Sequence, residues 1–355
     1  MSHHIFYVAN TQADNLGDLV INTLLLKELS NRGSLNINVR GCSSNYRGML
    51  DSVNSSKTEK SYPLYVLSML FLSLKGEKVS FYLKPGHFYG NDGGAVKKTI
   101  TLFCYILMKF SGVKISRLGA SLGPYRPISG KIERLQSLFF KAYTAREYIS
   151  ISYAKKIGIK NLEYCPDMAF LLDKDKSPAS HHEGPVIISF REKTLSDDTE
   201  NLELAPTLIA AASHFKGKPM LAVSQVTSDA PHNQALADKI DSNVKHVIFD
   251  SLDDGSKIFD TYSKASYVLS NRLHVLLFAA SKGAIPIPII DKDKHIKITG
   301  IFDAANLGDL IFDVNSKDDI VKHLIFVEEN RTIIEDKLEL AFEQQKNKIL
   351  NFFDK

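Results

Sequence analysis

The chain has 355 residues, of which 44% are hydrophobic and 24% are charged. This length suggests two domains of ordinary size, and the composition is that of a soluble globular protein. A net charge of +4 excludes the strongly basic balance of a nucleic-acid-binding protein, but it is compatible with an anionic substrate or an anionic membrane surface. The three cysteines, Cys42, Cys104 and Cys165, form no Cys-x-x-Cys pair, so the sequence signals neither a disulfide framework nor a zinc site and fits a reducing compartment.

Targeting signals are not evident. The start of the chain lacks the charged and apolar regions of a signal peptide. The apolar run 64–74 is shorter than the roughly 20 residues that cross a bilayer, so it predicts a buried helix, with contact at a membrane surface as the alternative. We therefore expect a cytoplasmic protein, and we keep open a peripheral contact with the inner face of the cell membrane.

The first half alternates strand and helix patterns. A buried strand is predicted at 5–9, and helical spacing from Asp18 ends near Gly33. Further strands are predicted at 37–41, 79–83, 114–118 and 143–147, and helices at 64–74, 99–108, 131–141 and 149–158. The helix at 99–108, like the one at 64–74, is predicted to be buried. The stretch 43–62 shows no convincing period, and glycine-rich loops follow two strands, at 84–94 and 119–124. This repetition is typical of a doubly wound parallel sheet.

The loop after the first strand, 14–18, is not a nucleotide-phosphate motif. It has neither the Gly-x-Gly-x-x-Gly fingerprint nor a P-loop lysine. Asn15, Gly17 and Asp18 would instead lie at the carboxyl end of the strand, where open α/β sheets bind ligands. The alternative is that Asp18 only caps the following helix.

A polar segment at 173–185, with proline and glycine, is the predicted linker to a second βα-repeating domain. Its strands are predicted at 186–190, 219–223, 246–249 and 267–269, and Pro286 and Pro288 mark the edge of the next strand. Its helices are predicted at 207–215, 233–240 and 256–262, with one or two more at 318–353. We place the domain bounds at 1–176 and 184–330, followed by a C-terminal helix at 331–355.

The stretch Tyr267–His274 organises this second domain. Strand-favouring residues lead into Ser270 and Asn271, which are good helix caps, and a helical apolar run follows. Arg272 and His274 would then lie at a strand-to-helix turn, where backbone N–H groups and the helix dipole attract anions. The alternative for this pair is a surface cation and a core histidine.

Arg191 follows the strand at 186–190 and would converge with Arg272 on one edge of the sheet. Two guanidinium groups there suit a ligand that carries a carboxylate and a phosphate.

Several motifs together resemble the polysaccharide pyruvyl transferase family, over most of the chain up to about Pro288. They are Asn15–Asp18, Gly93–Gly94, Gly119–Pro124, Ala145–Ser150, Pro166–Phe170, Ile188–Arg191 and Arg272–His274. The resemblance implies two Rossmann-like doubly wound domains that face a cleft, as in B-type glycosyltransferases. It also implies transfer of pyruvate from phosphoenolpyruvate to two hydroxyls of a sugar, as a cyclic ketal. The loop Lys84–Gly94 departs from the family because it lacks the usual run of three glycines.

The resemblance and the residue chemistry together assign roles. The donor ligands would be Arg191, Arg272 and Leu273, with Arg146 as a further anion ligand. His274 would protonate the methylene carbon of the donor, and Asp18 would accept a hydroxyl proton. The acceptor contacts would be Asn15, Gly17 and Ser121. The N-terminal domain would be the acceptor side and the C-terminal domain the donor side. We expect no metal, no cofactor beyond phosphoenolpyruvate as co-substrate, and no nucleic acid, with a lipid-linked saccharide acceptor as one alternative. The other functions left open are a nucleotide-sugar-dependent glycosyltransferase of B-type fold and a non-catalytic capsule-assembly protein.

Overall fold

The computed structural model describes residues 2–12, 14–90, 94–175, 182–192, 204–241, 243–249 and 255–353. The chain forms two compact units. The N-terminal unit comprises residues 1–13 and 18–168, and the C-terminal unit comprises residues 14–17 and 169–355. The short segment 14–17 therefore belongs by its contacts to the C-terminal unit, although it follows the first strand of the N-terminal one.

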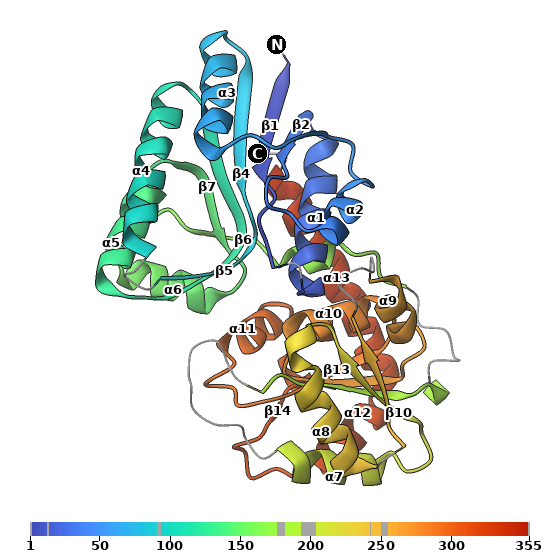
Figure 1. Ribbon diagram of the computed structural model, residues 1–355. Helices are drawn as coiled ribbons and strands as arrows, with labels where there is room; N and C mark the ends of the chain where they lie inside the picture. The colour runs from blue at the N-terminus through green and yellow to red at the C-terminus, as the bar shows by residue number, and fades with distance from the viewer. Residues whose placement is uncertain are drawn as a thin grey trace. The chain divides into compact units, whose positions relative to one another are not determined.

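The N-terminal unit is built on a parallel sheet that has eight strands in the described part of the chain (Figure 1). Along the sheet the strands run in the order β3-β2-β1-β4-β6-β7-β8, and β5 pairs with β6. Their bounds are β1 His3–Val8, β2 Ser34–Asn38, β3 Ser56–Thr58, β4 Lys78–Leu83, β5 Gly86–Gly90, β6 Lys114–Tyr125, β7 Phe140–Ala145 and β8 Glu163–Tyr164. Every described pairing is parallel, as the alternating pattern predicted.

Helices cover both faces of this sheet, with α3 and α4 on one face and α1 and α2 on the other (Figure 1). Their bounds are α1 Leu16–Ser30, α2 Ser44–Leu50, α3 Tyr62–Leu74, α4 Ala95–Phe110, α5 Pro127–Ser137 and α6 Tyr148–Lys156. Proline stands in the first turn of α3 and of α5, where its missing N–H has no helical partner to lose.

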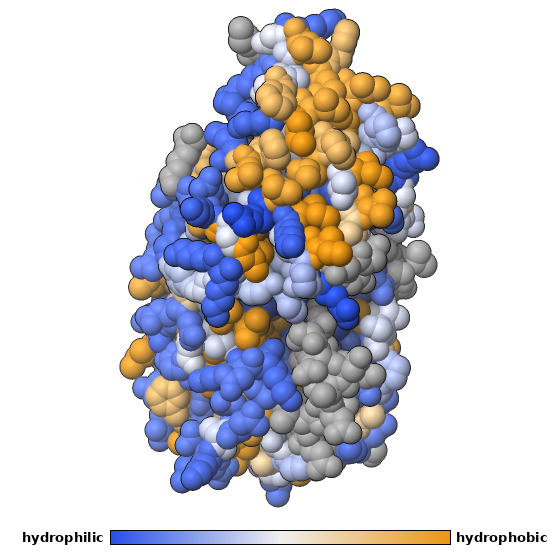
Figure 2. Space-filling view, turned by 90° about the vertical axis from the view of Figure 1, so that its left-hand side faces the viewer, coloured by the Kyte–Doolittle hydropathy of each residue, from blue (hydrophilic) through white to orange (hydrophobic). Residues whose placement is uncertain are grey.

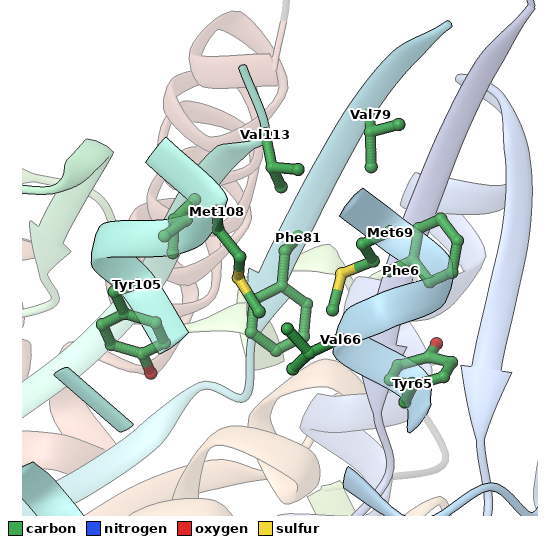
Figure 3. Close-up of a cluster of buried hydrophobic side chains, with 10 residues drawn as sticks. Phe6, Tyr65, Val66, Met69, Val79, Phe81, Tyr105, Met108 and Val113 are labelled. Atoms are coloured by element: carbon green, nitrogen blue, oxygen red, sulfur yellow. The ribbon is translucent and has the colours of Figure 1, made fainter. Parts of the chain in front are cut away.

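The core on one face of the sheet joins β1, β4 and β6 to the inner sides of α3 and α4. In Figure 3, Met69 of α3 and Met108 of α4 flank Phe81 of β4, and all three side chains are almost completely buried. Flexible thioethers fill the gaps beside an aromatic ring well, so the inner sides of the two helices are held by ordinary core packing.

Three expectations for this unit are wrong. The segment 84–94 is not a loop throughout, because β5 occupies Gly86–Gly90 and pairs with β6; the stretch 43–62, which shows no period in the sequence, holds α2 and β3. The segment Gly119–Pro124 is not a loop, since β6 runs through it from Lys114 to Tyr125, paired on both sides. The helices predicted as buried, α3 and α4, are buried on one side only.

The C-terminal unit has a second parallel sheet, in the order β11-β10-β9-β12-β13-β14. Its strands are β9 Val186–Ser189, β10 Met220–Ser224, β11 Lys245–Ile248, β12 Tyr267–Ser270, β13 Ile285–Ile290 and β14 Phe312–Asp313; its helices are α7 Leu204–His214, α8 Ala230–Ile240, α9 Ser256–Tyr262, α10 Leu273–Ser281, α11 Ile296–Ala304, α12 Ile320–Glu329 and α13 Arg331–Phe353. Pro286 and Pro288 lie inside β13 rather than at its edge. This is tolerated because β14 pairs only with Ile289 and Ile290.

Among the described residues, no helix combines the length and the apolar character that crossing a membrane requires.

Candidate active site at the carboxyl edge of the C-terminal sheet

The central feature of the site is the end of two neighbouring strands. β9 and β12 are paired in register so that Ser189 lies opposite Ser270. The hydroxyl of Ser270 donates to the carbonyl of Ser189 and accepts the backbone N–H of Arg272 at 2.9 Å. The chain therefore leaves both strands at the same edge, as the sequence predicted for Arg191 and Arg272.

Asn271 locks the two strand ends together. Its side-chain oxygen accepts the backbone N–H of Arg191 at 2.8 Å, and its side-chain nitrogen donates to the carbonyl of Arg191 at 3.1 Å. The expectation that Ser270 and Asn271 cap the helix is wrong, because Arg272 is the N-cap of α10 and no side chain caps it. Both polar side chains are used across the sheet instead.

The two arginines influence each other electrostatically. Burial and the charge of Arg272 lower the pKa of Arg191 to about 10, so Arg191 is still a cation at neutral pH. Its Nε is buried and has no hydrogen-bond partner among the described residues. A half-buried guanidinium group beside another cation, with a buried Nε that has no partner among the described residues, is a favourable place for an anionic ligand.

Asp229 is a third charged group at this edge, which the sequence analysis did not single out. It lies in the 3-10 turn Thr227–Asp229 after β10, and its carboxylate forms an ion pair with the Nε of Arg272. Burial raises the pKa of Asp229, while Arg272 and Arg191 act against that rise. The ion pair holds one edge of the Arg272 guanidinium group, and the three groups together still carry one net positive charge when ionised.

Two histidines near these charges were also missed. His295 is the N-cap residue of α11, directly after the loop that leaves β13, and its Nδ1 lies 3.1 Å from the carbonyl of Asp291. Burial lowers the pKa of His295, and the charge of Arg191 adds to this effect. His232, on α8, also has a pKa lowered by burial, which Glu192 and Asp229 oppose. His295 could have been found from the sequence, because it follows an apolar strand just as Arg191 and Arg272 do.

His274 lies in the first turn of α10, with Leu273 before it, and its ring stacks on Phe278 with centroids 5.6 Å apart. Gly17 packs directly against this imidazole, since a Cβ at position 17 would lie 2.4 Å from His274 Nδ1. Only a residue without a side chain fits there unless the ring moves.

The segment 14–17 reaches this edge through backbone contacts. Asn15 forms an antiparallel bridge with Val226, and the N–H of Leu16 donates to the carbonyl of Gln225 at 3.3 Å. The structure thus brings two predicted acceptor residues, Asn15 and Gly17, to the same unit as Arg191, Arg272 and His274. Asp18 is the next residue in the chain, and it belongs by its contacts to the N-terminal unit.

Arg146 and Ser121 lie in the N-terminal unit, in a buried polar network. Arg146 forms an ion pair with Asp167, and its Nε donates to the hydroxyl of Ser121 at 2.7 Å. Ser121 in turn donates to Glu147 at 3.1 Å, and both predicted site residues are at most 3% exposed. These contacts give Arg146 and Ser121 a structural role, so their substrate contacts stay predictions that no observation supports. Gly93, from the predicted glycine pair, lies outside the described residues.

No group of three or more His, Cys, Asp or Glu side chains within the described ranges is arranged to hold a metal ion.

Comparison with known proteins identifies a family. The model of the family "Polysaccharide pyruvyl transferase" matches residues 15–289, which include every residue of the site apart from His295. No curated protein sequence matches the chain.

Solved structures show the fold. The UDP-GlcNAc 2-epimerase of Neisseria meningitidis, solved with UDP-GlcNAc bound, superposes with a TM-score of 0.55 at 12% identity, over 99% of this chain and 100% of that one. A glycosyltransferase of Rickettsia africae gives 0.54 at 12% identity, over 99% and 94% of the two chains. At such low identity the likeness supports the architecture alone, which is the predicted pair of parallel α/β sheets of the B-type glycosyltransferase kind.

Proposed function

The chain belongs to the polysaccharide pyruvyl transferase family, and from this membership we propose that it forms a pyruvate ketal on a sugar of a cell-surface polysaccharide or its precursor, with phosphoenolpyruvate as the donor. The observation that carries the proposal is that Arg191 and Arg272 follow the ends of the paired strands β9 and β12. The Nε of Arg191 is buried there and has no hydrogen-bond partner among the described residues. Phosphoenolpyruvate has two anionic groups, a carboxylate and a phosphate, which two guanidinium groups can hold in a fixed orientation.

The ion pair between Asp229 and Arg272 is compatible with donor binding. A guanidinium group has five N–H donors, and Asp229 engages the Nε edge. Asp229 therefore orients Arg272, while the terminal nitrogens are the groups that would meet the donor.

His274 supplies the proton in this proposal. Ketal formation begins when a proton reaches the methylene carbon of phosphoenolpyruvate, which becomes a methyl group and leaves an oxocarbenium-like centre at C2. A sugar hydroxyl attacks C2, the C2–O bond to phosphate breaks, and a second hydroxyl of the same sugar closes the ring. The proton of the first hydroxyl passes to Asp18 and from there to the leaving phosphate, and the proton of the second hydroxyl restores the imidazolium, so the histidine acts first as acid and then as base.

The acceptor side of the proposal uses the segment 14–18. Gly17 lies against the imidazole of His274, so the backbone of this segment is close to the group that handles the proton. Asn15 offers an amide, and Asp18 is the carboxylate that we assign as the acceptor of the first hydroxyl proton. Leu273, the first residue of α10, contributes a backbone N–H at the helix N-terminus to the donor.

The direct test is phosphate release from phosphoenolpyruvate, measured with a panel of sugars and lipid-linked sugars. We expect release that depends on one class of acceptor and a product that contains a carboxyethylidene group by mass. Thermal unfolding adds a second readout, since phosphoenolpyruvate should raise Tm by binding the folded state.

The remaining functions predict different results. A nucleotide-sugar glycosyltransferase would be stabilised by a nucleoside diphosphate and not by phosphoenolpyruvate, and a non-catalytic assembly protein would respond to neither. Either pattern would overturn the proposed donor. We place the enzyme in the cytoplasm, where phosphoenolpyruvate is made; recovery of the protein from the periplasm would contradict this.

A further inference from the structure

Two helices of the N-terminal unit, α3 and α4, are apolar on two opposite sides. Their inner sides belong to the buried core, through Tyr65, Val66 and Met69 of α3 and Tyr105 and Met108 of α4 (Figure 3). Their outer sides are apolar as well. The outer residues, which we call the α3–α4 apolar face, are Leu64, Leu67, Phe71, Leu74, Val96, Ile100, Phe103, Leu107 and Phe110, each at least 57% exposed.

The α3–α4 apolar face is continuous. On each helix its members recur at intervals of three or four residues, so they form one stripe along the helix. The two helices pack against each other, and α4 also packs against α5. Figure 2 shows hydrophobic side chains gathered over this part of the surface. Scattered exposed leucines are normal on a protein surface, whereas a continuous face of this kind marks an interaction site.

Positively charged side chains lie beside this face. From Lys60 to Lys141 the sequence holds thirteen Lys and Arg and three Asp and Glu, a formal charge of +10, so the rest of the chain carries −6. Lys75, Lys97 and Lys109 are exposed on or beside the two helices. Lys75 lies over the ring of Phe71, with Nζ 4.2 Å from the centroid, so its stem covers part of the apolar face while its charge stays at the rim.

We propose that the α3–α4 apolar face docks onto an anionic lipid bilayer. Apolar side chains on exposed helices, with lysines at the edge, are the features of a helix that lies in the interface between headgroups and acyl chains. The basic rim would face anionic headgroups and attract them. A second copy of this chain fits less well, because two identical faces would bring two rims of the same positive sign together. The inference stands on this surface alone and does not rest on the proposed function.

The test is vesicle co-sedimentation with the full chain. We expect binding to vesicles of phosphatidylcholine with phosphatidylglycerol, and weaker binding to phosphatidylcholine alone. Replacing two members of the face, in the variant Leu67→Ser/Phe103→Ser, should lower the affinity at least about tenfold. The matched control is Ile333→Ser/Leu340→Ser on α13, which removes two apolar side chains that are 66% and 52% exposed in the C-terminal unit and should bind as the wild type does.

Lysine variants separate the contribution of the lipid headgroups to the binding affinity from the contribution of the acyl layer. Lys75→Gln/Lys97→Gln/Lys109→Gln should lose about a hundredfold in affinity for the anionic vesicles and little for neutral ones. Three exposed lysines of the C-terminal unit, replaced in Lys216→Gln/Lys245→Gln/Lys257→Gln, provide the control with the same change of net charge.

Three outcomes would overturn the proposal. They are a wild type that does not bind anionic vesicles, a Leu67→Ser/Phe103→Ser variant that binds them as tightly as the wild type does, and a wild-type dimer that this same variant turns into a monomer in the absence of lipid. Phosphate release with a water-soluble acceptor should be equal in wild type and variant, so a failure of the docking proposal is distinguishable from a failure of the proposed chemistry.

Discussion

The side chain of Asn271 holds the backbone of Arg191 at both its N–H and its carbonyl, at 2.8 and 3.1 Å. This contact fixes the end of β9 against the end of β12. It therefore fixes the backbone position from which the Arg191 side chain extends. Asn271→Ala should raise the Kd for phosphoenolpyruvate about tenfold, because two buried backbone groups lose their partner and Arg191 loses its position. Isothermal titration with phosphoenolpyruvate measures the change.

Asn38 offers a matched control. It is also buried, donates to the carbonyl of Lys60 at 2.9 Å and accepts the N–H of Arg40 at 3.2 Å, all within the N-terminal unit. Asn38→Ala should cost a similar amount of stability without changing donor affinity. Equal loss of donor affinity in both variants would mean that Asn271 acts through stability alone.

Arg191→Lys and Arg272→Lys should each weaken phosphoenolpyruvate binding at least about tenfold while the fold is kept. Lysine keeps the charge but cannot hold a carboxylate or a phosphate through two parallel hydrogen bonds. Arg331→Lys is the control, since Arg331 is buried and paired with Glu335. Near-normal donor affinity in both site variants would remove the arginine clamp from the mechanism.

His274→Ala should retain donor binding and lose about 10²–10⁴ in kcat, which is the usual contribution of a general acid. His274→Gln separates two roles, because glutamine can hydrogen-bond a phosphate but cannot deliver a proton usefully. Single-turnover rates for both variants provide the measurement. If glutamine restores a near-normal rate, the residue only positions the donor.

Gly17→Ala should disturb the same imidazole from the opposite side. The added Cβ would meet His274 Nδ1 at 2.4 Å, so the ring or the segment 14–17 has to shift. A displacement of this size is expected to lower kcat about tenfold to a hundredfold, with a smaller change in donor affinity. Gly48→Ala in α2, where a Cβ meets nothing within 4 Å, is the control and should leave turnover unchanged. Unchanged kcat in Gly17→Ala would place the reacting proton elsewhere.

Arg117 and Glu133 form a buried ion pair in the N-terminal unit. Arg117 Nη1 lies 2.5 Å from Glu133, which also accepts the hydroxyl of Tyr143 at 2.7 Å. Burial alone would raise the pKa of Glu133, but Arg117 holds it below its usual value. Arg117→Met leaves this buried carboxylate with Lys98, whose Nζ lies 3.7 Å away, as its remaining cation, and should lower the free energy of unfolding by about 3 kcal/mol in urea denaturation.

The double variant Arg117→Met/Glu133→Leu should recover part of this loss, because the buried carboxylate is removed together with its cation, while Lys98 loses its carboxylate partner and keeps its contact with the ring of Tyr125. A single variant as stable as the wild type would show that water reaches Glu133.

Residue patterns alone were sufficient for the architecture. Apolar runs of strand length, each followed by a loop and a helical period, predicted two parallel α/β sheets, and β9, β12, α9 and α10 lie within a few residues of their predicted places. The same patterns put Arg191 and Arg272 at one sheet edge, because the carboxyl ends of parallel strands always share an edge. Local periodicity is enough for such conclusions, since it reflects which side of each element faces the core.

Contacts between segments that are distant in the sequence could be identified only in the three-dimensional structure. The sequence assigned Asn271 to a helix cap, yet its amide bonds with a residue 80 positions earlier, and the Asp229 partner of Arg272 was not foreseen. Likewise, the apolar pattern of α3 and α4 predicted burial, but a helix that is apolar all round has two faces and the sheet can cover only one of them. Which face is covered, and which side chain meets which charge, depends on packing between elements that are far apart in sequence, and no local period encodes it.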